Sequence, residues 1–129
     1  MKRTRVNHTS AKKRAQEREI SRLKAERFET QKWCSGCGKS TTHIGALDYS
    51  HIVKRSARPD LITHPKNFTL DCRECHRVWD RGDVIEQMKL VDFDHRIRVM
   101  KQLAPDVYHL HYDMPKLPPA TEEDNLPFI

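Results

Sequence analysis

The chain has 129 residues, of which 36% are hydrophobic and 33% are charged, and its formal net charge at pH 7 is +6. This length favours a single domain, and the low apolar content predicts a small hydrophobic core. No apolar run reaches the roughly 18 residues of a transmembrane helix, and no apolar segment follows the basic amino terminus as in a signal peptide. We therefore expect a cytoplasmic protein without a membrane partner.

The positive charge is concentrated at the amino terminus. Residues 1–33 contain eleven Lys and Arg against four Asp and Glu, a net charge of +7. Basic charge gathered at one end predicts an arm that contacts nucleic-acid phosphates. A charged helix that is merely solvated explains the same pattern, and the sequence leaves both interpretations open.

The first half of the chain is expected to contain one helix and two strands. Residues 1–9 lack periodicity and are expected to be disordered, whereas good helix formers predict a helix over residues 11–30. Loose alternation of apolar residues predicts a strand over residues 46–53. A second short strand is expected over residues 67–70, after a basic loop containing two X-Pro pairs.

The second half of the chain is expected to be helical. A helix is predicted from Cys75 to Arg81, ending at Gly82, and a capping box of Asp83 and Glu86 predicts the next helix, over residues 84–91. An apolar stripe predicts a third helix that ends before Pro105. Pro-rich, acidic residues 105–129 are expected to form an extended tail, disordered from residue 115. The predicted fold class is α+β, with a basic arm (residues 1–32), one domain (residues 33–104) and the tail.

Four cysteines occur as two Cys-x-x-Cys pairs, Cys34 with Cys37 and Cys72 with Cys75. In a cytosolic chain this pairing indicates metal ligands and not disulfides. Four thiolates complete a tetrahedral zinc site and leave no open position for water, so this zinc would be structural. Such a metal would also supply stability that the small core lacks.

Three further polar residues accompany the cysteines: His51 in Ser-His-Ile, Asn67, and His76 directly after Cys75. With these residues in this order, the stretch from Cys34 to Arg81 resembles the HNH endonucleases of the four-cysteine, zinc-bearing kind, also called His-Me finger or ββα-metal nucleases. The resemblance covers a little over a third of the chain. It implies a ββα-metal core and metal-dependent hydrolysis of DNA. Small stand-alone members of this family are frequent in bacteriophages, which implies action in a host cytoplasm.

The resemblance implies a role for each of these three residues. His51 would be the general base, for which an ordinary imidazole pKa near 6.5 is suited at neutral pH. His76 would ligate a catalytic divalent ion such as Mg²⁺ or Mn²⁺, and Asn67 would orient His51 by bonding the loop backbone. The alternatives are a backbone-bonded strand histidine, a surface helix histidine and a turn-capping asparagine.

One position departs from the family pattern, because Ser50 stands where the family commonly has a metal-binding aspartate. A serine hydroxyl is a poor ligand for a hard cation. Asp48 lies two residues earlier on the same face of the strand, and we expect it to reach the metal directly or through water. The alternative function is a catalytically inactive zinc-finger protein that binds nucleic acid. An interaction adaptor that uses the charged helix is a third.

DNA contacts are expected from basic residues of the loop and of the helix that follows it. Contacts of this kind position the phosphate backbone without reading sequence. No helix resembles a dedicated base reader, so specificity is expected to be low or to come from a protein partner. The expected DNA-binding residues are Lys54, Arg55, Arg58, Lys66, Arg73 and Arg77.

Overall fold

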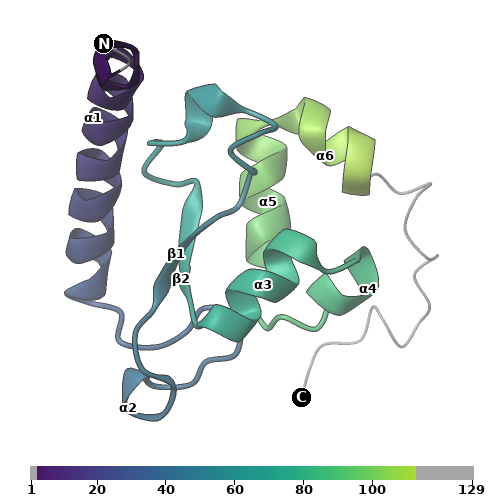
Figure 1. The fold of residues 1–129 in the computed structure, drawn as a ribbon. Coiled ribbons are helices and arrows are strands. Elements are labelled where there is room, and N and C mark those ends of the chain that lie inside the picture. The colour runs from purple at the N-terminus through teal and green to yellow at the C-terminus, as the bar shows by residue number, and fades with distance from the viewer. Residues whose placement is uncertain (1–2, 113–129) are drawn as a thin grey trace.

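The computed structural model describes the backbone of residues 3–112 and the side chains of residues 11–112. A two-stranded antiparallel sheet lies between a long amino-terminal helix and the helices of the second half of the chain, so the predicted α+β class is confirmed (Figure 1). The elements in chain order are α1 (Arg3–Phe28), α2 (Thr41–Ile44), β1 (Asp48–His51), the 3₁₀ turn η1 (Pro59–Leu61), β2 (Phe68–Asp71), α3 (Arg73–Arg81), α4 (Val84–Gln87), α5 (Phe93–Leu103) and α6 (Pro105–Tyr112).

The hairpin of β1 and β2 carries the residues around which the helices pack. Its register places Asp48 opposite Asp71 and His51 opposite Phe68. Helix α3 packs against both strands. Its Trp79 is only 1% exposed, and the indole N–H donates to the backbone carbonyls of His51 and Ile52 at 3.0 and 3.1 Å. These bonds join the last turn of α3 to the end of β1.

The local signals at the helix ends appear in the structure. The Cys72 side chain caps α3 by accepting the backbone N–H of Cys75, and α3 ends at Gly82 as the sequence predicts. The capping box of Asp83 and Glu86 is also present. Helix α4 is nevertheless shorter than the predicted segment of residues 84–91, because it ends at Gln87.

Two predictions about the chain ends are wrong. Helix α1 begins at Arg3, although residues 1–9 were expected to be disordered. Extending a formed helix by one residue is far easier than nucleating one, and residues 3–10 include neither glycine nor proline, which would stop it. At the other end, Pro105 begins α6 where an extended tail was expected, because its fixed φ suits the first helical position.

Helix α6 belongs to the folded body. Its Tyr112 is 7% exposed and stacks on Trp79 with ring centroids 6.1 Å apart. The Tyr112 hydroxyl donates to Gln87, whose amide in turn donates to the Trp79 carbonyl. Residues 105–112 therefore pack with the predicted domain of residues 33–104. The predicted disorder over residues 115–129 lies outside the described residues.

The amino-terminal half of α1 stands clear of the body. Residues 11–15 are all exposed, whereas Leu23 near the other end of α1 is only 6% exposed. Over the described part of the chain, no helix combines the length and apolarity that are needed to cross a bilayer.

Candidate metal centre and active site

The four cysteines gather into one cluster. Their Sγ atoms all lie within 4.8 Å of one another, and none forms a disulfide. A tetrahedral zinc with Zn–S distances of about 2.3 Å places its sulfurs about 3.8 Å apart. The backbone N–H of Cys72 points at the Cys34 sulfur at 3.2 Å, as is favourable for a thiolate. The cluster fits a structural metal such as zinc, in agreement with the prediction.

The first Cys-x-x-Cys turn is pressed closely against the second. A Cβ added at Gly36 would lie 2.8 Å from the Cβ of Cys75 and 3.0 Å from the Leu90 side chain, so only glycine fits there. Gly38 has a φ of +77°, which glycine adopts without strain. The cluster thus ties the segment before the hairpin to the start of α3. Because Cys75 belongs to the cluster, it also fixes the position of His76, the next residue of α3.

His51 is held in one orientation at the end of β1. The side chain is 8% exposed, and its Nε2 lies 2.9 Å from the Ile62 carbonyl oxygen. Because a carbonyl oxygen only accepts, Nε2 carries the proton and Nδ1 keeps a lone pair. Burial lowers the pKa of His51 below its ordinary value, against the opposing effect of the Ile62 bond. Burial therefore favours the neutral imidazole at His51 more than it is favoured in an exposed histidine.

Asn67 fixes the loop that holds His51. It is fully buried, and its Oδ1 accepts the Val53 N–H at 2.6 Å. Its Nδ2 donates to the carbonyls of Val53 and Leu61 at 3.1 and 3.0 Å. Leu61 immediately precedes Ile62, the residue whose carbonyl bonds His51. Asn67 therefore makes the backbone bonds that the sequence analysis expected, and through them it positions the acceptor of the His51 ring.

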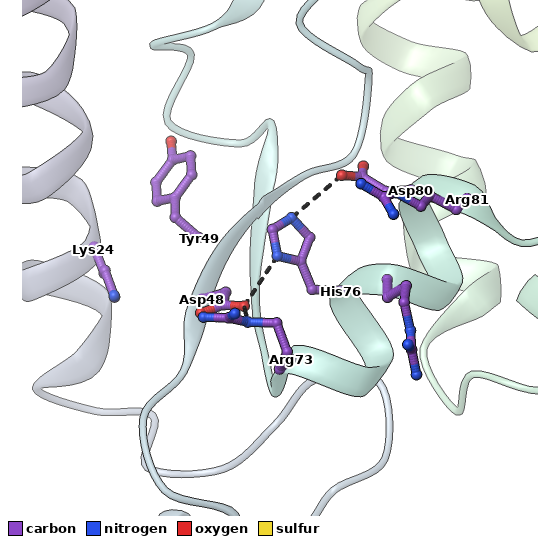
Figure 2. A pocket seen from close by; sticks show the side chains of 8 residues that line it. Lys24, Asp48, Tyr49, Arg73, His76, Asp80 and Arg81 are labelled. Atoms are coloured by element: carbon purple, nitrogen blue, oxygen red, sulfur yellow. Dashed lines mark hydrogen bonds and ion pairs between the residues drawn. The ribbon is translucent and has the colours of Figure 1, made fainter.

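His76 lies between two carboxylates (Figure 2). Its Nδ1 is 3.1 Å from Oδ2 of Asp48, and its Nε2 is 3.5 Å from Oδ2 of Asp80. Nε of Arg73 also donates to Asp48, at 2.9 Å. Partial burial alone would raise the pKa of Asp48, but the hydrogen bonds from His76 and Arg73 outweigh burial and lower that pKa. Asp48 is thus a carboxylate with two donors already in place.

The two histidines face a shared cleft. One hollow of about 520 Å³, the His76 pocket, adjoins a second of about 540 Å³, the His51 pocket. His76 lines both pockets, and His51 lines the second. The residues common to both are Tyr49, His76, Asp80 and Arg81. The expected convergence of His51 and His76 on one space is therefore found.

No protein-family model, curated protein or solved structure matches the chain. What the cleft can do is therefore judged from its own residues. Positive charge dominates its lining, with six Lys and Arg side chains against two carboxylates. The six cations are Lys24, Lys54, Arg55, Arg73, Arg77 and Arg81, and the two carboxylates are Asp48 and Asp80.

Four of the six expected DNA-binding residues line this cleft. Lys54 and Arg55 lie in the His51 pocket, and Arg73 and Arg77 lie in the His76 pocket. The other two line neither pocket. Arg58 binds Asp60 and Asp106 through ion pairs of 2.7 and 3.3 Å, and Lys66 lies elsewhere on the loop.

Ser50 does not reach the cleft. It is fully buried, its Oγ has no hydrogen-bond partner among the described residues, and it lines neither pocket. The serine at the family's aspartate position is therefore no candidate ligand in this arrangement.

Sequence reasoning missed several residues of the cleft. Asp80 lies four residues after His76, so helical periodicity places both on one face of α3, and that spacing was available as a signal. Arg81 is adjacent to Asp80 and lines both pockets. Lys24 had no comparable signal, because its place in the cleft depends on how α1 docks against the hairpin.

Proposed function

We propose that the protein is a metal-dependent DNA endonuclease of the HNH, or ββα-metal, type, which hydrolyses phosphodiester bonds and leaves a 5′-phosphate. The observation that carries this proposal is the position of His51. Its Nε2 lies 2.9 Å from the Ile62 carbonyl oxygen, and the ring lines a cleft with a second histidine and an excess of cations. A general base, a phosphate-attracting surface and a candidate metal ligand are thus close together.

His51 would accept a proton from water at Nδ1, and the resulting hydroxide would attack the phosphorus in line with the departing 3′ oxygen. The bond from Nε2 to Ile62 is kept when the ring becomes an imidazolium, because both ring nitrogens then donate. Lys54, Arg55 and Arg81 attract the phosphates on either side of the scissile bond. Asn67 keeps the base aimed throughout.

The side chains around His76 have the nitrogen and oxygen donors that a hard divalent ion accepts, but they are not all placed for one ion. The Asp48 carboxylate accepts a hydrogen bond from Nδ1 of His76, so Nδ1 carries the ring proton. Nε2 of His76 is then the nitrogen left for a metal. Asp80 is the carboxylate on the Nε2 side. Among the described side chains, only the four cysteines bring three or more ligand atoms within 4.8 Å.

We therefore assign His76 and Asp80 as the protein ligands of the catalytic ion. Asp48, which the sequence suggested as a ligand, instead orients His76 through Nδ1, a role that carboxylates commonly play beside metal-binding histidines. Two protein ligands suffice for Mg²⁺, which usually keeps several waters and binds substrate phosphate. Such an ion supplies neutralisation of charge on the phosphate oxygens.

Cleavage of supercoiled plasmid DNA with added Mg²⁺ or Mn²⁺ tests the proposal. We expect nicking by the wild-type protein and a rate about 10²- to 10⁴-fold lower for His51→Ala, because the positioned base is lost. His43→Ala is the matched control, since His43 is exposed on α2 and lines neither pocket. Equal nicking by His51→Ala and wild type would remove the enzyme assignment.

The pH dependence of cleavage gives a second test. Because burial lowers the pKa of His51, the base is deprotonated at a lower pH than an exposed histidine. We expect kcat/KM to rise with pH through an apparent pKa below about 6.5 and to level off near neutrality. Rates measured from about pH 5 to about pH 8, with circular dichroism recorded at each pH, check this. A rise centred well above neutrality would contradict the role of His51.

A catalytically inactive zinc-finger protein that binds nucleic acid is the second candidate. The burial of Ser50 favours it, because the position that the family commonly uses for a metal ligand contributes nothing to the cleft. The ion pair of Arg73 with Asp48 also favours it, because a cation already neutralises that carboxylate. This candidate predicts DNA binding without nicking under any divalent ion, so the same plasmid assay separates the two functions.

A further inference from the structure

One turn in the carboxy-terminal half of α1 borders the cleft. Lys24 lines the His76 pocket and Ile20, one helical turn earlier, lines the His51 pocket. Figure 2 shows Lys24 on α1, across the hairpin from His76 and α3. The wall opposite α3 is thus made by a helix that lies outside the stretch resembling a nuclease.

The part of α1 that carries Lys24 is fixed to the hairpin. Leu23 is buried, and the Arg27 guanidinium lies 3.9 Å from the centre of the Phe68 ring. Arg27 also donates to the carbonyls of Phe68 and Pro65 at 3.1 and 3.3 Å. With contacts at positions 23 and 27, the helical turn between them has a set rotation, and Lys24 is directed to the cleft.

Lys24 has no counter-ion among the described residues. Both carboxylates of its pocket have other partners, because Asp48 is bound by Arg73 and His76, and Asp80 lies 3.5 Å from His76. Its neighbour on the helix, Arg22, is different, because it pairs with Glu19 and Glu26 at 2.7 and 2.9 Å. Two cations of α1 that are only two residues apart therefore differ. Lys24 lies in the cleft and pairs with no described carboxylate, whereas Arg22 is exposed and already neutralised.

We propose that α1 is the second wall of the DNA-binding cleft and that Lys24 contacts a backbone phosphate next to the scissile one. This inference rests on the proposed function for the position of the scissile phosphate. The partner is double-stranded DNA, held between the cations of α3 and the ammonium group of Lys24. An unpaired cation that faces an electropositive hollow is stabilised when a polyanion enters, and counterions are then released from the DNA.

The test is the salt dependence of binding to a short fluorescein-labelled DNA duplex, measured by fluorescence anisotropy on zinc-loaded protein without added Mg²⁺ or Mn²⁺. We expect Lys24→Gln to weaken binding and to make the negative slope of log K against log salt less steep by about 0.9, the value for one lost phosphate contact. Lys24→Arg is expected to keep the slope, since it retains the charge.

Arg22→Gln is the matched control, because it removes the same charge from the same helix at a paired, exposed site. It is expected to leave the slope at the wild-type value. Identical slopes for Lys24→Gln and wild type, or an equal loss in both Gln variants, would overturn the proposal. Binding is measured without cleavage, so the two proposals can fail separately. A wild-type protein that does not nick plasmid but shows the Lys24 effect would contradict the nuclease function, while α1 would still be a wall of the DNA-binding cleft.

Discussion

Replacing Cys75 by serine is expected to unfold most of the domain. The four cysteines join the segment before β1 to the start of α3, and the core around them is small for a chain of this length. Structural zinc contributes roughly 10–16 kcal/mol of apparent binding free energy in zinc-finger peptides. That range exceeds or matches the roughly 5–15 kcal/mol net stability of ordinary domains. Loss of one ligand therefore removes enough stabilisation to shift the chain toward the unfolded state.

Zinc content by atomic absorption and helix content by circular dichroism check this prediction. We expect about one zinc per wild-type chain, loss of the circular dichroism signal on treatment with a strong chelator, and its recovery on adding zinc. Cys75→His is the matched variant, because imidazole also ligates zinc, and it is expected to retain more structure than Cys75→Ser. A metal-free wild-type protein that melts as the zinc-treated one does would contradict the structural role of the cluster.

The parts of the fold that were predictable are those specified by short-range signals. The Cys-x-x-Cys pairs, the end of α3 at Gly82 and the capping box of Asp83 with Glu86 depend on residues within four positions of one another. The bonds of Asn67 to the loop were expected on a different ground, the resemblance to the HNH endonucleases, since Asn67 and Val53 lie 14 positions apart.

The parts that were not predictable depend on contacts between distant segments. Lys24 enters the cleft because Arg27 docks on Phe68, a pairing across 41 positions of the sequence. Helix α6 packs on the folded body because Tyr112 stacks on Trp79. The proline-rich composition of residues 105–129, taken alone, favours an extended tail instead. Strand alternation placed Asp48 on the face of the metal site, but its ion pair with Arg73 of α3, 25 positions away, could not be read from the sequence.

A buried ion pair behind the site was also missed, and breaking it is expected to destabilise the protein strongly. Arg96 of α5 is fully buried and donates to both carboxylate oxygens of Asp71, at 2.9 and 2.7 Å. Arg96→Met would leave the buried Asp71 carboxylate without its cation, and also the Asp92 carboxylate, which Arg96 binds at 2.9 Å. Removing one partner of such a buried pair costs about 3–5 kcal/mol. Unfolding in urea, followed by circular dichroism, measures this loss.

The same substitution is expected to slow cleavage. The Arg96 guanidinium lies 5.2 Å from the centre of the Trp79 ring, and the Trp79 indole holds the His51 backbone. Loss of Arg96 removes one of the contacts that fix this ring, so His51, the proposed general base, would be less well positioned even in molecules that remain folded. We therefore expect a lower kcat with little change in KM, since none of these residues touches the DNA.

The double variant Asp71→Asn/Arg96→Met distinguishes an unpaired charge from a lost packing contact. The amide that replaces the Asp71 carboxylate would still accept the hydrogen bond that Thr69 donates at 3.0 Å, but it brings no charge into the core. If the stranded carboxylate causes the destabilisation, the double variant is more stable than Arg96→Met alone. If it is no more stable, the Asp71 carboxylate does not cause the loss, which then comes from the packing of Arg96 on Trp79 or from its ion pair with Asp92.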